Sequence, residues 1–432
     1  MIRREMREAK RKMVLLSLLA CFLFLTLVAF RRPNSFMSEY THRSANPTAS
    51  ATPRTNSKAK SWLKGRPISM GPVLGNGQRH LSDSSLADLR NTSLGFEKVF
   101  VLNMPSRTDK LDAMTLAASV TGFDFDVLEG VQGESIPKKA LSGKWESRPG
   151  IEGVVGCWRG HMNFAKEYTF LPALLDQTLI RVLVFRIVRG RLSSALIIED
   201  DADWDLNLRS MMEYIALGSQ TLLDTPHRET PRSPYGDGWD LMWFGHCASS
   251  TIKGDDRRFI MKNDPNVPPP QRRANYGQIP DMSSYDNNTR IMFFTAGNTC
   301  TYSYALSYHG AAKILKYLSM DIYNKPIDFG LREMCDKQDR GFKCLSVFPQ
   351  IFGEHKPAGA DERDSDIDPG NRTSVRTKGY SHNTVHSTRL NVEHLIDGRM
   401  DLLESQYGEE PQLEGPIVTE YRKGLEEPIP SI

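Results

Sequence analysis

An apolar segment that runs straight into a cluster of acids constrains the fold of this chain most. Residues 195–198 are apolar at four successive positions, which is typical of a strand buried on both faces in a parallel sheet. Four acidic side chains follow within residues 199–203. Open α/β sheets place their ligand crevice at the carboxyl ends of such strands. The segment therefore predicts an α/β fold with a polar site at this end of the sheet.

The acidic run is chemically suited to a hard metal ion. Neighbouring carboxylates raise one another's pKa unless a cation neutralises them, and Mg²⁺ or Mn²⁺ prefers oxygen ligands. In an extended chain, Glu199, Asp201 and Asp203 would share one face and Asp200 the other. The alternative is a solvated acidic turn that caps the next helix. The buried strand in front favours the metal site.

The N-terminus predicts a compartment. Residues 13–30 form an uninterrupted apolar run behind a basic segment, residues 1–12. A membrane span needs about 17–25 such residues, and basic flanks stay in the cytosol. We expect a single-pass type II signal anchor with a luminal catalytic part in the Golgi or ER. A cleaved signal peptide is the alternative, although its apolar region is usually shorter.

Composition divides the luminal part. Residues 31–95 are polar and rich in Ser, Thr, Pro and Arg, which predicts a flexible stem. Alternating strand and helix patterns then run from 96 to about 390, as in an α/β domain with a mainly parallel central sheet, and a polar C-terminal tail is expected over 391–432. The net charge is only +3 and no basic stripe is interleaved with aromatic residues, so no nucleic-acid partner is expected.

A luminal location also makes disulfides possible. Cys21 lies in the predicted anchor. Cys335 and Cys344 are close enough in sequence to close a small loop, and Cys247 with Cys300 is a second possible pair. Buried reduced thiols are the alternative.

Several ordered motifs resemble glycosyltransferase family 25, which contains lipooligosaccharide and collagen-type galactosyltransferases, and its fungal members in particular. The motifs are VFVLNMPSRTDK, GVVGCWRGHMN, SSALIIEDDADWD, YGDGWDLMWFGH, and CTYSYALSYHGAAKILKYL with PIDFGL, followed by FGEHKPAG and DSDI. The resemblance covers residues 96 to about 368. It implies a GT-A-like fold, a UDP-sugar donor such as UDP-galactose, Mn²⁺ (or Mg²⁺), and a glycan or glycoprotein acceptor.

The resemblance also assigns roles to residues. Glu199, Asp200 and Asp201 match the acidic element that holds the metal on the donor diphosphate, with Asp203 as a further possible ligand. The first strand and turn contribute Leu102, Asn103 and Arg107 to the nucleotide site.

Asp328 matches the acceptor side. It is the candidate base that takes the proton of the acceptor hydroxyl, with a helix-capping Asp as the alternative. His355 follows the last strand and is a candidate third metal ligand. His161 is expected to be a packed or capping histidine.

Residues 168–186 interrupt the family pattern between the GCWRGHMN helix and the acidic strand. They are either a genuine insertion or translated intron sequence, and sequencing the transcript distinguishes the two. Two other functions remain open: a catalytically inactive luminal binding protein that keeps the fold, and a different luminal metal-dependent enzyme such as a phosphodiesterase.

Overall fold

The computed structural model describes residues 81–175, 194–225, 231–337, 340–367, 373–408 and 417–424. In these ranges no helix has the length and apolar character of a membrane span. The predicted cytosolic tail, the anchor, and the stem up to residue 80 lie outside them, as do residues 176–193, which hold most of the predicted insertion.

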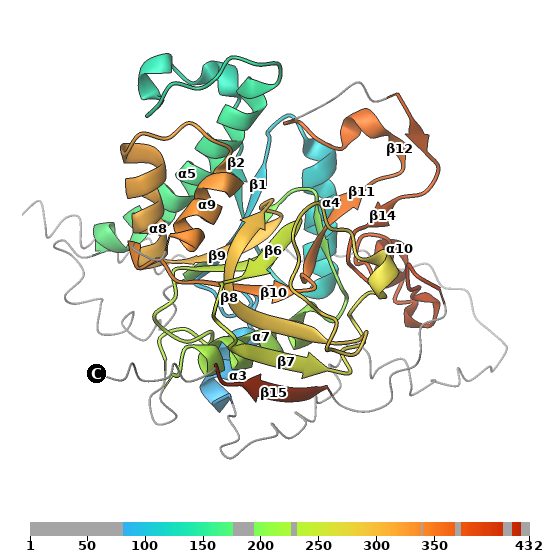
Figure 1. The fold of residues 1–432 in the computed structure, drawn as a ribbon. Coiled ribbons are helices and arrows are strands. Elements are labelled where there is room, and N and C mark those ends of the chain that lie inside the picture. The colour runs from blue at the N-terminus through green and yellow to red at the C-terminus, as the bar shows by residue number, and fades with distance from the viewer. Residues whose placement is uncertain are drawn as a thin grey trace, which may run out of the picture. The chain divides into compact units, whose positions relative to one another are not determined.

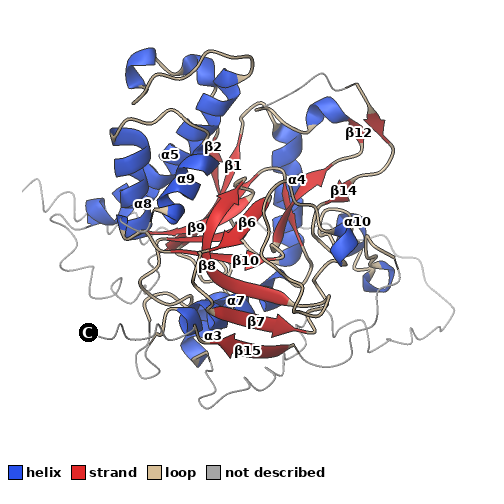
Figure 2. Ribbon diagram, in the orientation of Figure 1, coloured by secondary structure: helices blue, strands red, loops and turns tan. Residues whose placement is uncertain are grey.

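A large mixed sheet forms the centre of the described part of the chain (Figures 1 and 2). Its strand order is β15-β7-β8-β10-β5-β9-β3-β1-β2, with β6 paired to β8. The strands are β1 (Lys98–Asn103), β2 (Asp126–Glu129), β3 (Ser194–Glu199), β5 (Leu241–Gly245), β6 (Ala248–Thr251), β7 (Arg258–Lys262), β8 (Arg290–Thr299), β9 (Ser303–Ser307), β10 (Cys344–Phe348) and β15 (Val418–Arg422).

The strand directions confirm the predicted α/β class. Strands β2, β1, β3, β5 and β10 run in one direction, and β9 runs against them between β3 and β5. Beyond β10 the sheet continues through the antiparallel strands β8, β7 and β15. The sheet is therefore mainly parallel in strand direction, but antiparallel where β9 and the β8–β15 side join it.

Helices lie on both faces of this sheet (Figure 2). In the described ranges they are α3 (Asp83–Leu89), α4 (Thr108–Thr121), α5 (Ile151–Leu175), α7 (Leu208–Leu222), α8 (Tyr308–Leu315), α9 (Ile327–Asp336) and α10 (Val392–Ile396). Side chains alternate between the faces along each strand. Val101 and Ile198 pack in the core with α4 and α7, whereas Phe100 and Ile197 pack in the core with α5, α8 and α9. This is why residues 195–198 are apolar at every position.

A small second sheet continues directly from the acidic run. The chain leaves β3, turns at Asp200 and Asp201, and forms β4 (Ala202–Trp204). Strand β4 pairs with β11 (Phe352–Lys356), which pairs with β14 (Tyr380–Ser381). Close by in the chain, β12 (Gly359–Ala360) pairs with β13 (Val375–Arg376).

Two predicted boundaries are wrong. The stem was expected to reach residue 95, but α3 lies within it, and Leu81, Leu89 and Leu94 are buried in the core. The polar tail was expected from residue 391, but β15 pairs with β7 along its whole length and extends the sheet. The folded part therefore begins earlier and ends later than the composition indicates.

Both suggested disulfides are present, Cys247–Cys300 and Cys335–Cys344. Cys157 is the free cysteine within the described ranges. Helix α5 continues to Leu175, so the first residues of the predicted insertion extend this helix.

Candidate active site

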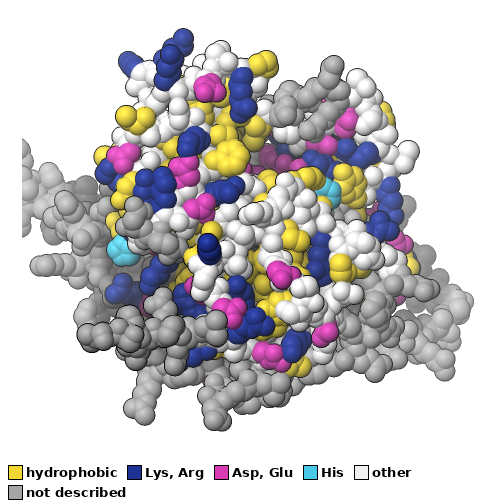
Figure 3. Space-filling model, viewed as in Figure 1, with side chains coloured by type: hydrophobic (Ala, Val, Ile, Leu, Met, Phe, Trp, Pro, Cys, Tyr) yellow, Lys and Arg dark blue, Asp and Glu magenta, His cyan; other side chains and the backbone are white. Residues whose placement is uncertain are grey.

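A cavity of about 530 Å³ lies at the carboxyl ends of β1, β2 and β3. Its walls are Leu102 and Met104 at the end of β1, residues 130–134 after β2, and the face of α5 that carries Gly153, Gly156 and Gly160. The acidic run Glu199, Asp200 and Asp201 and the segment 365–367 complete it. Figure 3 shows acidic side chains within a hollow in the upper part of this face of the molecule.

The glycines of α5 allow the cavity walls to pack closely. A Cβ on Gly156 would lie 2.2 Å from the carbonyl oxygen of Val131, and one on Gly153 would lie 2.8 Å from that of Ile367. The GVVG pattern is therefore inside the helix, where larger residues would push away the loop after β2 and the segment 365–367. Gly153, Gly156 and Gly160 therefore form a glycine-lined face of α5.

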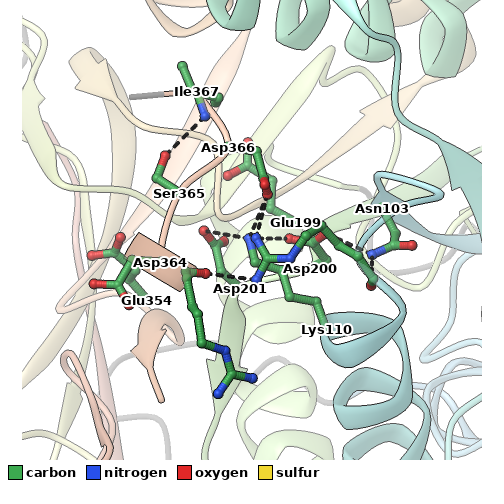
Figure 4. Close-up of polar contacts among 12 residues, drawn as sticks. Asn103, Lys110, Glu199, Asp200, Asp201, Glu354, Asp364, Ser365, Asp366 and Ile367 are labelled. Atoms are coloured by element: carbon green, nitrogen blue, oxygen red, sulfur yellow. Dashed lines mark hydrogen bonds and ion pairs between the residues drawn. The ribbon is translucent and has the colours of Figure 1, made fainter. Parts of the chain in front are cut away.

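Strand register brings the predicted Asn103 to the acidic run. Leu102 pairs with Glu199 across β1 and β3, so the next residues along the chain, Asn103 and Asp200, also lie side by side. The Asn103 side-chain amide donates to Asp200 Oδ2 at 2.8 Å, and it also donates to the Arg107 carbonyl at 3.0 Å. Asp200 is thus fixed against the turn that follows β1 (Figure 4).

Lys110, which the sequence reasoning missed, lies among the carboxylates. Its Nζ is 3.0 Å from Asp200 Oδ1, 3.9 Å from Asp201 Oδ2 and 3.5 Å from Asp366 Oδ2 (Figure 4). Although burial opposes the shift, Asp201, Asp200 and Asp366 raise the pKa of Lys110. The ammonium group therefore supplies a positive charge to this acidic corner.

Asp201 is the least satisfied of the three acids. Its Oδ1 is buried and has no hydrogen-bond partner. Burial raises the pKa of Asp201 to about 7; Lys110 opposes the shift, and Glu199 and Asp200 add to it. A buried carboxylate oxygen without a partner is suited to bind a cation. The cation would compensate for both the lost hydration and the neighbouring negative charges.

We expect Asp201 to make the ion-free protein less stable as the pH rises. Its pKa is 3.8 in the unfolded chain and about 7 in the fold, so the folded state retains the proton over this interval. The stability that this provides is complete below about pH 4 and is lost as the pH rises through about 7. In EDTA, the urea midpoint of the wild type should fall relative to that of Asp201→Asn as pH rises from 4 to 8. A difference that does not change with pH would contradict the raised pKa.

Glu199 faces a different set of partners from Asp200 and Asp201. Thr301 donates its hydroxyl to Glu199 Oε1 at 2.6 Å, and His161 Nε2 lies 3.2 Å from the same oxygen. Glu199 nevertheless lines the cavity together with the other two acids. His161 and Thr301 are the neighbours of this acid that sequence reasoning did not find.

The structure does not bring Asp203 and His355 to the cavity. Asp203 is fully buried and accepts hydrogen bonds from the backbone of Trp204 and the hydroxyls of Ser381 and Ser387. His355 Nδ1 lies 2.8 Å from Ser381 Oγ, and burial lowers the pKa of His355 to about 4. These two predicted ligands belong to the packing of the small β4–β11–β14 sheet, and we do not include them in the metal site.

Arg107 ties two segments together beside the cavity. It is ion-paired to Asp109 at 3.0 Å and to Asp366 at 2.7 Å, and it donates to the Arg363 carbonyl at 2.7 Å. The hydrogen bond with Asp109 is the main reason that its pKa is raised. Arg107 is not among the residues that line the cavity, whereas Leu102 is. Arg107 therefore holds the segment around Asp366 against the start of α4.

Asp328 lies in the first turn of α9 and also does not line the cavity. Its Oδ2 accepts from the Cys300 amide at 3.1 Å and its Oδ1 from the Phe329 amide at 2.8 Å. Burial raises the pKa of the Cys157 thiol well above its usual value, and Glu199 and Asp328 add to this shift. Cys157 itself is part of the cavity wall.

The cavity combines an acidic run, a lysine between the carboxylates, and a glycine-lined helix face, all at the carboxyl ends of parallel strands. No protein-family model matches the chain, and no curated protein shows significant similarity to it.

Proposed function

We propose that this protein is a membrane-anchored luminal glycosyltransferase. It transfers a sugar, in our proposal galactose, from a UDP-sugar to a glycan or glycoprotein acceptor with the help of Mn²⁺ or Mg²⁺. The main supporting observation is Asp201, whose unpaired buried oxygen lies with Glu199 and Asp200 in a cavity at the end of β3. The ordered motifs that resemble glycosyltransferase family 25, with its GT-A-like fold, support the same proposal.

Asp201, with Asp200 and Glu199, would hold the divalent ion. Such an ion supplies positive charge to the diphosphate leaving group as the glycosidic bond breaks. Lys110 Nζ lies between Asp200, Asp201 and Asp366, and its positive charge would help to hold a donor phosphate in the cavity. Asn103 would hold Asp200 in place through its side-chain hydrogen bond.

The size and walls of the cavity suit a nucleotide-sugar donor. Small-molecule sites commonly enclose about 300–1,000 Å³, and this cavity has about 530 Å³. Leu102 and Met104 offer apolar surface at the end of β1, where Leu102 is the strand neighbour of Glu199. Arg107 would act indirectly, by holding Asp366 at the cavity rim.

Asp328 remains our proposed base for the acceptor hydroxyl. It is half-buried in the first turn of α9, and its charge adds to the raised pKa of the Cys157 thiol in the cavity wall. Its two oxygens accept the backbone amides of Cys300 and Phe329, which fix the orientation of the carboxyl group.

Two disulfides support a luminal location, because such bonds persist in oxidising compartments. The apolar residues 13–30 and the basic residues before them favour an uncleaved anchor in the Golgi or ER membrane.

A donor screen with the purified full chain tests the proposal. We expect slow hydrolysis of one UDP-hexose without acceptor, dependent on added Mn²⁺ and abolished by EDTA, with release of UDP as the measured quantity. UDP-sugar binding without turnover would favour the inactive binding protein. Cleavage of simple phosphodiesters instead of UDP-sugars would favour a phosphodiesterase.

A further inference from the structure

Three side chains of metal-binding type, one of them Glu199 of the acidic run, converge at the end of β3. Cys157 and His161 are four residues apart on α5, so they lie on the same helix face. Glu199 reaches them from the end of β3. Each residue offers one ligand atom, and the three atoms all lie within 4.8 Å of one another. They are the Cys157 sulfur, a His161 ring nitrogen and a Glu199 oxygen.

His161 has the geometry of a metal ligand. Its side chain is fully buried, and its Nδ1 is 2.9 Å from the Tyr304 hydroxyl. Its Nε2 lies 3.2 Å from Glu199 Oε1, but the two atoms are not aligned for a hydrogen bond, and Nε2 has no other partner. A buried ring nitrogen without a hydrogen-bond partner is energetically unfavourable. Histidine ligands typically use one nitrogen for the metal while a hydrogen-bonded neighbour orients the other.

The ligand types distinguish this group from the all-carboxylate corner. Sulfur and imidazole nitrogen favour zinc and similar transition metals over Mg²⁺ or Mn²⁺. In a tetrahedral zinc site, nitrogen and oxygen ligands are about 3.4 Å apart, given bond lengths near 2.0–2.1 Å. The observed separation of 3.2 Å between His161 and Glu199 is close to this value.

We propose that Cys157, His161 and Glu199 form a second metal site, for a zinc-class ion. Cys157 and Glu199 both line the cavity, so the fourth coordination position opens onto it. Three protein ligands with one open position are typical of catalytic rather than structural zinc sites. The site does not depend on glycosyl transfer, since it follows from the three side chains alone. Because this site includes Glu199, a zinc-class ion bound here would leave only Asp200 and Asp201 of the acidic run to bind Mn²⁺ or Mg²⁺.

Cobalt binding by the full chain tests this site directly. Cys21 is replaced by serine, so that Cys157 is the free thiol beside the two disulfides. One equivalent of Co²⁺ should then produce a thiolate-to-cobalt charge-transfer band in the near ultraviolet, and Zn²⁺ should remove it. Cys157→Ser should abolish the band, and Glu199→Gln should weaken Co²⁺ binding by at least about tenfold.

Asp201→Asn is the matched control, since it alters the neighbouring carboxylate corner without removing any of the three ligands. It should retain the cobalt band. Thermal unfolding of Cys157→Ser and Cys157→Ala, compared with the parent, shows whether the fold is kept. Absence of the band in the parent, or a band that persists in both folded Cys157 variants, would overturn the proposal, whatever the UDP-sugar assay shows.

Discussion

Replacement of Asp201 by asparagine is expected to reduce metal-dependent turnover by about 10²–10³-fold, the size of effect seen when one charge-stabilising group is removed from an active site. Asp201 has the buried oxygen without a partner and lies beside Asp200 and Lys110. The amide keeps the shape of the side chain but removes the negative charge that would hold the ion. The measurement is kcat for UDP release at saturating Mn²⁺.

The loss of turnover should not come from unfolding. At pH 7 and above without metal, Asp201→Asn is expected to be at least as stable as the wild type, because it removes a charge that burial disfavours. Asp321→Asn is the control. Asp321 is an exposed partner of Lys316 far along the chain from the acidic run, and its replacement should leave kcat within about twofold. A folded Asp201→Asn protein with wild-type turnover would exclude Asp201 from the metal site.

The position of the site could be predicted because it depends on local pattern. Consecutive apolar residues before Glu199 require a strand covered on both faces, and the chain must then turn at the sheet edge. On β1, the strand next to β3, Leu102 pairs with Glu199, so Asn103 comes at the same level as Asp200. These two strand ends meet because the strands are parallel neighbours, which the strand–helix–strand pattern implies.

The partners of the acids could not be predicted, because they come from distant parts of the chain. Lys110 meets Asp200 across 90 residues and Thr301 meets Glu199 across 102. A lysine in the first turns of a helix is usually a solvated surface residue. Its role here depends on how α4 packs against the end of β3, and no local pattern specifies that packing.

The misplacement of Asp203 has a clear physical cause. The prediction treated residues 199–203 as one extended strand, in which alternate side chains share a face. The chain instead turns at Asp200 and Asp201 and starts β4, whose partner is β11 and not a strand of the large sheet. The alternation begins again after the turn, so Asp203 points into the small sheet. A similar limit applies to β15, a short polar edge strand with too little apolar pattern to be recognised.

Asp203→Ala is therefore expected to lower stability rather than to remove a metal ligand. The carboxylate is fully buried and accepts from the amides of Trp204 and Arg389 and from two serine hydroxyls. Its removal leaves these donors unsatisfied. It also removes one of the negative charges that favour the charged form of the half-buried Arg389. Loss of one partner from a buried charged network costs about 3–5 kcal/mol, which urea unfolding of the ion-free protein measures.

Mn²⁺ distinguishes a structural Asp203 from a metal-binding one, because the two roles predict different effects of the ion on the stability of Asp203→Ala. If Asp203 only supports the small sheet, Asp203→Ala loses stability equally with and without the ion, and the stabilisation by Mn²⁺ persists. If Asp203 were a ligand, the ion-free protein would be little affected and the stabilisation by Mn²⁺ would disappear. Asp321→Ala, at the exposed Lys316 pair, should change stability by no more than about 0.5 kcal/mol in either condition. The same unfolding series thus separates a buried support of β4 from a member of the metal site.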